Sequence, residues 1–192
     1  MPDLDFTGLS DQDASVVKCA IARQENFHGY IPSQSLAFIV HNYRALASSG
    51  VLEAPWLDAY MHASHLSTFG EQVVRDVFDA CDRARLRELK PLGDSIVLGR
   101  DERDRITLFR GCAGPVHSLG MSWTPSLDKA IWYAAHHAEY YQLDNKAVYV
   151  ATVPVNDIYC RLDHYDDDFI VRPREAWPVD VPVKEFRLDR PR

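Results

Sequence analysis

The chain has 192 residues, of which 46% are hydrophobic, and a formal net charge of -7 at pH 7. This length is enough for one compact domain, or for a catalytic domain with a helical extension. The negative charge gives no support to a nucleic-acid partner, because non-specific duplex binding depends on clustered lysine and arginine. No segment reaches the roughly 18 to 20 apolar residues of a membrane-spanning helix.

Cellular location is indicated by the first residues and by the cysteines. The sequence starts Met-Pro-Asp-Leu-Asp, which is acidic where a signal peptide is basic. The cysteines lie far apart, at Cys19, Cys81, Cys112 and Cys160. None forms a CxxC pair, so neither a zinc site nor a disulfide framework is predicted. We therefore expect a cytoplasmic protein with reduced thiols.

The first half has the apolar spacing of amphipathic helices. The first predicted helix begins at Ser10 or Asp11, both of which are good N-cap residues. The second has Pro32 near its first turn and ends before Gly50.

Two more helices complete the predicted helical unit. The third has Pro55 in its first turn. The fourth is expected to start at a capping box formed by Thr68 and Glu71, and to continue through Leu86. Together the four helices predict a helical subdomain over residues 1–92.

The second half, residues 93–192, alternates polar and apolar residues and predicts an α+β domain. Strands are expected at Ser95–Leu98, Arg105–Arg110, Met121–Thr124, Ala147–Val153, Ile158–Leu162, Phe169–Val171 and Val183–Leu188. The charged run 99–104 is predicted to be a hairpin turn. One helix is expected, from Thr124-Pro125 or Ser126 through Ala138.

Three fragments of this half place polar residues at or near the end of a β-type run: Phe109-Arg110-Gly111, Gly120-Met121-Ser122-Trp123-Thr124 and Asp166-Asp167-Asp168-Phe169-Ile170-Val171. Such side chains often meet in one cleft. With the helical segment 128–134 and the strand 148–154, they resemble, in order, the small ADP-ribosyltransferase-like proteins of bacteria and phages. The resemblance covers about residues 105–173 and does not reach the helical first half.

The resemblance implies a split, strongly curved β-sandwich that holds NAD in a central cleft, with a catalytic set of the Arg-Ser-Glu type. We expect an NAD-consuming mono-ADP-ribosyltransferase. Its acceptor would be a protein side chain, on a host or rival factor if the protein is phage-borne or toxin-like.

Arg110 is the candidate for binding the diphosphate of NAD, because a guanidinium is a planar and permanently charged donor. The backbone of Gly111 would approach the nicotinamide amide, since no Cβ blocks it. The alternative is that Arg110 is a surface strand residue paired with an acid.

Ser122 and Thr124 fall on one face of a predicted strand, with Trp123 on the other. The resemblance implies that Ser122 and Thr124 order the cleft, although Thr124 is also suited to begin the next helix. Trp123 is expected in the core. Tyr133 is the candidate for stacking on the nicotinamide ring, with core packing as the alternative.

The acidic segment departs from the family pattern, which has Glu-x-Glu before an apolar strand. By match, Asp168 is the catalytic acid and Asp166 the acid that orients the acceptor. Both fall on one face of the strand. Aspartate is one methylene shorter, which sets its carboxylate back by on the order of 1 Å. A run of three aspartates is also typical of a turn.

The histidines do not predict a metal site. His62 and His65 lack a third ligand, and the adjacent His136 and His137 point in different directions along a helix. Structural or surface roles are the better interpretation.

Three rival functions remain open at this point. One is an NAD glycohydrolase, in which water replaces the acceptor. Another is a catalytically inactive binding or inhibitory module on the same fold. The third and weakest is a metal-dependent hydrolase built on the aspartate run, which would contain bound metal.

Overall fold

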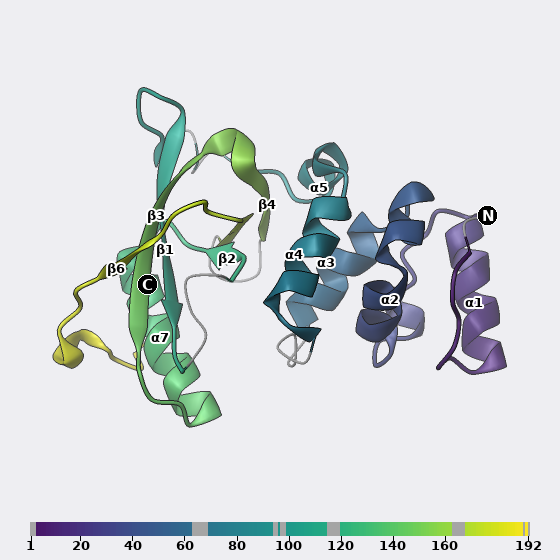
Figure 1. Cartoon of the computed structure of the whole chain (residues 1–192), viewed down its shortest axis with the longest axis horizontal. Helices are drawn as coiled ribbons and strands as arrows, with labels where there is room; N and C mark the ends of the chain where they lie inside the picture. The colour runs from purple at the N-terminus through teal and green to yellow at the C-terminus, as the bar shows by residue number, and fades with distance from the viewer. Residues whose placement is uncertain are drawn as a thin grey trace. The chain divides into compact units, whose positions relative to one another are not determined.

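A computed structural model describes residues 3–62, 69–93, 96, 99–114, 120–162, 168–189 and 191. The chain forms two compact units, Met1–Leu89 and Lys90–Arg192, and each is described by itself (Figure 1). The fold is of the α+β class, as expected. Within the described ranges, no helix is long and apolar enough to span a bilayer.

The first unit is helical. Its elements are α1 (Asp11–Ala22), the 3-10 helix η1 (His28–Tyr30), α2 (Ser35–Ser48), α3 (Glu53–His62), α4 (Glu71–Ala80) and α5 (Arg83–Leu89). Their apolar faces bury large side chains completely, among them Phe27, Trp56 and Phe78. Trp56 and Phe78 meet edge to face, with ring centroids 5.3 Å apart, so α3 and α4 share one core.

The predicted limits of the first two helices are largely confirmed. Ser10 caps α1, and its hydroxyl accepts a hydrogen bond from the backbone N–H of Asp13 at 3.1 Å. Helix α2 begins at Ser35, later than Pro32 suggested, because the Pro32 carbonyl accepts a hydrogen bond from the Ser35 hydroxyl in a preceding turn. Gly50 follows α2 with a φ of +67°, as expected of a residue after a helix end.

The single fourth helix predicted through Leu86 is wrong. Cys81 adopts an extended conformation that ends α4, and α5 follows as a separate helix. Asp82 explains the break, because its carboxylate accepts from the N–H of Ala84 at 2.8 Å and so caps α5. The predicted capping residue Thr68 lies outside the described residues.

The second unit contains two antiparallel sheets and one long helix. Its elements are β1 (Arg105–Cys112), β2 (Ser122–Trp123), α7 (Leu127–Tyr141), β3 (Ala147–Pro154), η3 (Val155–Asp157), β4 (Ile158–Leu162), β5 (Asp168–Val171), β6 (Trp177–Val179) and η4 (Val183–Glu185). One sheet has the order β1-β3-β6 and the other β2-β5-β4. The strands predicted for β1 to β5 are therefore confirmed.

The two sheets are joined where β1 leads toward β2. Phe109 of β1 and Thr124, just after β2, exchange both backbone hydrogen bonds, at 2.7 and 2.8 Å. A continuous apolar core lies between the sheets. It includes Ile106, Leu108, Trp123, Ala151, Val153, Ile158, Phe169 and Val171. The expectation that Trp123 belongs to the core is confirmed.

Helix α7 covers the other face of the β1-β3-β6 sheet, and Figure 1 shows it running alongside β1 and β3. It packs Ala130 and Ala134 against Val148 of β3. Gly111 makes this close packing possible, because a Cβ there would collide with the backbone of Ala130 and Ala134.

Two of the predicted strands are not found in the described residues. Ile96 is helical, so the strand expected over Ser95–Leu98 is wrong where the chain is described. The turn before β1 is present, with Asp101 accepting backbone N–H bonds at 2.9 Å. Val183–Leu188 contains η4 instead of a strand.

The outer strand of the first sheet was not predicted. It is β6, whose Trp177–Val179 segment contains a proline and pairs with β3. Proline is tolerated there because β6 lies at the sheet edge.

Candidate functional site

Arg110 lies near the end of β1, on the face that carries Ile106 and Leu108 into the core between the sheets. Its side chain is half-buried, and Nη1 donates a hydrogen bond to the Ser122 carbonyl at 2.9 Å. The guanidinium passes so close to Gly120 that any Cβ at that position would strike it. Arg110 is therefore held in a fixed place between β1 and the start of β2.

Ser122 and Thr124 differ in burial. Ser122 is half-buried and pairs with Ile170 of β5, two residues beyond Asp168. Thr124 is only 2% exposed, and its hydroxyl accepts from the backbone N–H of Ser126 at 3.3 Å. Thr124 thus supports the turn into α7, while Ser126 is the N-cap of that helix. Ser122 lies in the same part of the unit as Arg110.

Gly111 has a structural function that the sequence did not indicate. Its missing side chain admits the backbone of α7, as described above. This contact is on the opposite face of β1 from Arg110. The glycine therefore fixes the distance between β1 and the helix that carries Tyr133.

Helix α7 carries two rows of aromatic rings at four-residue spacing. One row is Trp132, His136 and Tyr140, and the other is Tyr133, His137 and Tyr141. Trp132 donates from Nε1 to the Leu188 carbonyl at 2.8 Å, which ties the end of the chain to the helix.

Tyr133 points toward the acidic strand. Its hydroxyl donates to Oδ2 of Asp168, with 3.5 Å between the oxygens. Asp168 is the first residue of β5, is half-buried, and pairs with Leu162 of β4. The neighbouring acid predicted at Asp166 lies outside the described residues.

His137 belongs to the same cluster, although the sequence pointed to a structural role. It is half-buried, and its ring lies 5.8 Å from that of Tyr133. Burial, with the positive charges of Arg110 and His136, lowers the pKa of His137 from 6.5 to about 4. The sequence does carry a signal for this placement, because His137 follows Tyr133 by four residues and so lies on the same side of the helix.

These contacts connect residues that are far apart in the sequence. Arg110 binds the carbonyl of Ser122, and Ser122 pairs with the strand that begins at Asp168. Asp168 contacts Tyr133, and the ring of Tyr133 lies 5.8 Å from that of His137. We call Arg110, Ser122, Tyr133, His137 and Asp168 the Arg110 cluster. It combines a fixed cation, a carboxylate and a neutral imidazole.

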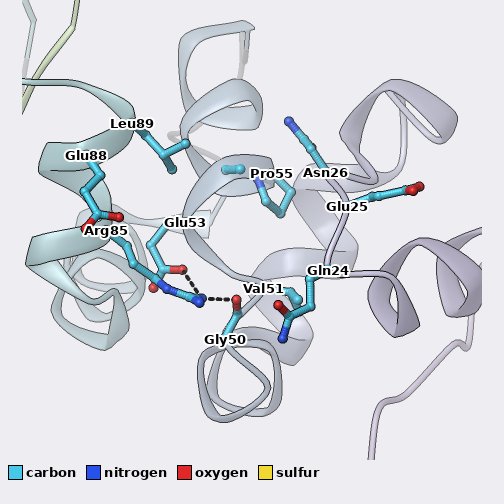
Figure 2. Close-up of a pocket in the computed structure, with 11 residues that line it drawn as sticks. Gln24, Glu25, Asn26, Gly50, Val51, Glu53, Pro55, Arg85, Glu88 and Leu89 are labelled. Carbon is cyan, nitrogen blue, oxygen red and sulfur yellow. Dashed lines mark hydrogen bonds and ion pairs between the residues drawn. The ribbon is translucent and has the colours of Figure 1, made fainter.

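A separate pocket of about 270 Å³ lies within the helical unit (Figure 2). Figure 2 shows Arg85 and Glu53 pointing toward one another at its edge, where Arg85 binds the Gly50 carbonyl. Glu53 lies 3.8 Å from Arg85 and accepts from the N–H of Asp82 at 2.8 Å. These polar groups bind one another across the helices, so we assign them to the packing of the unit.

Metal ligands are not grouped in the described residues, where no three His, Cys, Asp or Glu side chains could hold an ion. His62 stacks on His28 with ring centroids 5.7 Å apart, and its Nδ1 contacts the Asp58 carbonyl at 2.8 Å. His65 lies outside the described residues.

No protein-family model, curated protein or solved structure matches this chain.

Proposed function

We propose that the chain is an NAD-dependent mono-ADP-ribosyltransferase, with residues 93–192 as its catalytic domain. The observation that supports this proposal is that Arg110 binds the carbonyl of Ser122, whose strand β2 pairs with β5, the strand that begins at Asp168. Tyr133 of α7 contacts Asp168 in turn. An anion-binding cation and a carboxylate in one cluster suit a substrate that carries a diphosphate next to a reactive ribose.

We also infer that this domain has the split, curved β-sandwich of ADP-ribosyltransferases. Two observations support the inference. Two three-stranded antiparallel sheets enclose one apolar core, and they are joined at Phe109 and Thr124 instead of closing into a barrel. A dinucleotide would be bound at the surface beside this junction, where Arg110 and Ser122 are only half-buried.

In the proposed reaction, the bond between nicotinamide and the ribose C1′ breaks and its electron pair leaves with nicotinamide. A nucleophilic side chain of the acceptor protein then bonds to C1′ and loses its proton. The ribose passes through a state close to an oxocarbenium ion, which a carboxylate stabilises. We assign this function to Asp168, and the orientation of the acceptor to Asp166.

Arg110 is proposed to bind the diphosphate. Its bond to the Ser122 carbonyl fixes the plane of the guanidinium, so its charge is positioned before the ligand arrives. Ser122 and Thr124 support this geometry, the former through its carbonyl and the latter through the turn into α7. Gly111 lets α7 pack closely against β1. Its contact with the nicotinamide amide stays a prediction.

Tyr133 offers a reason why aspartate can serve where the family has glutamate. A shorter side chain reaches less far and must be held more firmly to be effective. The Tyr133 hydroxyl contacts one carboxylate oxygen of Asp168 and can orient the other toward the ribose. The ring of Tyr133 remains the candidate for stacking on nicotinamide.

Incubation with NAD labelled in its adenylate part, with and without a cell lysate, tests the proposal. Label on a protein supports transfer, whereas free ADP-ribose as the sole product supports the rival NAD glycohydrolase. If calorimetry detects no NAD binding and a stable partner is captured instead, the inactive binding module is favoured. The Asp168→Asn variant, prepared in parallel, controls for contaminating activity.

A further inference from the structure

His28 and His62 bring two imidazole rings together in the helical unit. His28 is the first residue of η1 and His62 the last residue of α3, and these two elements pack against each other. The ring centroids lie 5.7 Å apart, and the ring planes differ by 22°. Neither residue is buried, since His62 is exposed and His28 is only partly covered. Solvent therefore has access to the pair.

Hydrogen bonds decide which nitrogen of each ring carries the proton. The Nδ1 of His62 lies 2.8 Å from the Asp58 carbonyl oxygen, which can only accept, so this Nδ1 is protonated. The Nδ1 of His28 lies 2.7 Å from the Ser35 hydroxyl, whose own proton is donated to the Pro32 carbonyl at 3.3 Å. The hydroxyl oxygen thus accepts from Nδ1 of His28. In both neutral rings the lone pair is left on Nε2.

Asn26 ties the two histidines to each other. Its Oδ1 accepts from the backbone N–H of His28 at 3.0 Å, and its Nδ2 donates to the carboxylate of Asp58 at 2.6 Å. Asp58 in turn accepts from the ring of His62 through its carbonyl. One chain of hydrogen bonds therefore connects η1 with α3 and fixes where each histidine is placed.

Histidines that bind metal ions in proteins have the same pattern of hydrogen bonds. They donate one ring N–H to an oxygen, which orients the ring and leaves the lone pair of the other nitrogen for the metal. Nitrogen–metal bonds are about 2.0–2.1 Å long, so two imidazoles on one tetrahedral ion have ring centroids roughly 5 Å apart. The separation of 5.7 Å between His28 and His62 is close to this value.

We propose that His28 and His62 bind one divalent transition-metal ion through their Nε2 atoms, with water in its remaining coordination positions. Imidazole nitrogen suits Cu²⁺, Ni²⁺ and Zn²⁺, whereas Mg²⁺ and Ca²⁺ prefer oxygen ligands. Water replaces the third side chain that the described residues do not supply. The bound ion links η1 to α3 and stabilises the helical unit. This site lies outside the proposed catalytic domain and does not depend on the NAD chemistry.

Titration of the full, untagged chain with Ni²⁺ tests the proposal. Ni²⁺ suits imidazole, and thiols such as that of the exposed Cys19 compete for it less than for Zn²⁺. Calorimetry is expected to detect a single Ni²⁺ site and no binding of Mg²⁺. The melting temperature of the chain is expected to rise with the Ni²⁺ concentration, because the ion binds the folded pair and not the separated histidines.

Single substitutions separate this pair from the other histidines. His28→Gln and His62→Gln are each expected to weaken Ni²⁺ binding by at least about tenfold, since losing even a group that orients a ligand costs that much. His41→Gln is the matched control. His41 is an exposed histidine of α2 whose Nε2 lies 2.9 Å from the Asp5 carboxylate, and its replacement is expected to leave the Ni²⁺ affinity unchanged.

An NMR measurement gives the same answer if a variant fails to fold. Paramagnetic Ni²⁺ is expected to broaden the ring signals of His28 and His62 in the parent chain before those of any other histidine. Broadening of the His136 and His137 signals in their place would overturn the proposal. So would an absence of Ni²⁺ binding, or equal affinity in the parent and in both glutamine variants. Each of these outcomes leaves the proposed function standing.

Discussion

The Tyr133 hydroxyl lies 3.5 Å from Oδ2 of Asp168 and links α7 to the first residue of β5. The two residues are 35 positions apart in the sequence, and only the packing of α7 and of the second sheet around β1 brings them together. The contact places the Tyr133 hydroxyl beside an acid, where the sequence had suggested either stacking on nicotinamide or core packing.

Asp168→Asn is expected to abolish turnover of NAD while leaving NAD binding nearly unchanged. Loss of the negative charge removes stabilisation from the transition state, at a cost of at least about 100-fold in kcat. Tyr133→Phe keeps the acid but frees its oxygen, so a smaller loss of about tenfold is expected. Single-turnover kinetics and calorimetry measure the two effects separately. Full activity in Asp168→Asn would show that the acid has been misassigned.

Arg110→Ala is expected to weaken NAD binding by about 10- to 100-fold, because a charge-assisted contact to the diphosphate is lost. Arg105→Ala is a close control on the same strand. Arg105 also donates to a backbone carbonyl, that of Thr152 at 3.1 Å, so both variants lose one such bond. Equal NAD affinity in the two variants would refute the assignment of Arg110.

Gly111→Ala is expected to destabilise the second unit by about 2 kcal/mol or more, because the added methyl group would overlap the backbone of Ala130. Gly99→Ala serves for comparison, since its Cβ would lie 3.3 Å from the flexible end of Ile106. Chemical denaturation measures the free energy of unfolding of both variants. A stability change in Gly111→Ala as small as that in Gly99→Ala would contradict the close packing.

Glu53→Ala is expected to destabilise the helical unit by about 2–3 kcal/mol, since the N–H of Asp82 would lose its acceptor and Arg85 its acid. Glu88→Ala, at the rim of the same pocket, is expected to change stability by less than about 0.5 kcal/mol. Thermal unfolding of the two variants provides the test, and similar melting temperatures would speak against a structural role for Glu53.

The stability of the second unit is expected to decrease as the pH falls from about 6.5 to about 4. The folded state lowers the pKa of His137 to about 4, so in this interval the unfolded chain binds the additional proton. The shift sets an upper bound of about 3 kcal/mol on the effect. Urea unfolding over this range should show a weaker pH dependence in His137→Gln than in His136→Gln.

Sequence patterns predicted the elements that carry their own local signals. Ser10 before α1 and Ser126 before α7 cap their helices as expected, and β3 follows its run of β-branched residues. The division of the fourth helix was not predicted, although Asp82 is a good N-cap residue for α5. The N–H of Asp82 is also bound by Glu53, 29 residues earlier, and this contact cannot be read from the local sequence. Strand β6 was not predicted because its extended conformation depends on pairing with β3, which lies far away in the sequence.

Most candidate residues of the site could be named from the sequence, but their positions relative to one another could not. Arg110 and Asp168 follow from a resemblance in order and spacing. His137 does not, because its partial burial arises only when α7 packs on β1. The predicted approach of Gly111 to nicotinamide stays a prediction, and the close contact with the backbone of Ala130 is a packing role that the sequence did not indicate.

The short β6 has a protective consequence for the whole sheet. It pairs with β3 through only three residues, and its central Pro178 has no N–H to offer a further strand. The edge is therefore short and has one backbone donor fewer for pairing between molecules. Proteolytic loss of the segment from Trp177 onward would uncover the backbone of β3, and the clipped protein would be prone to aggregate.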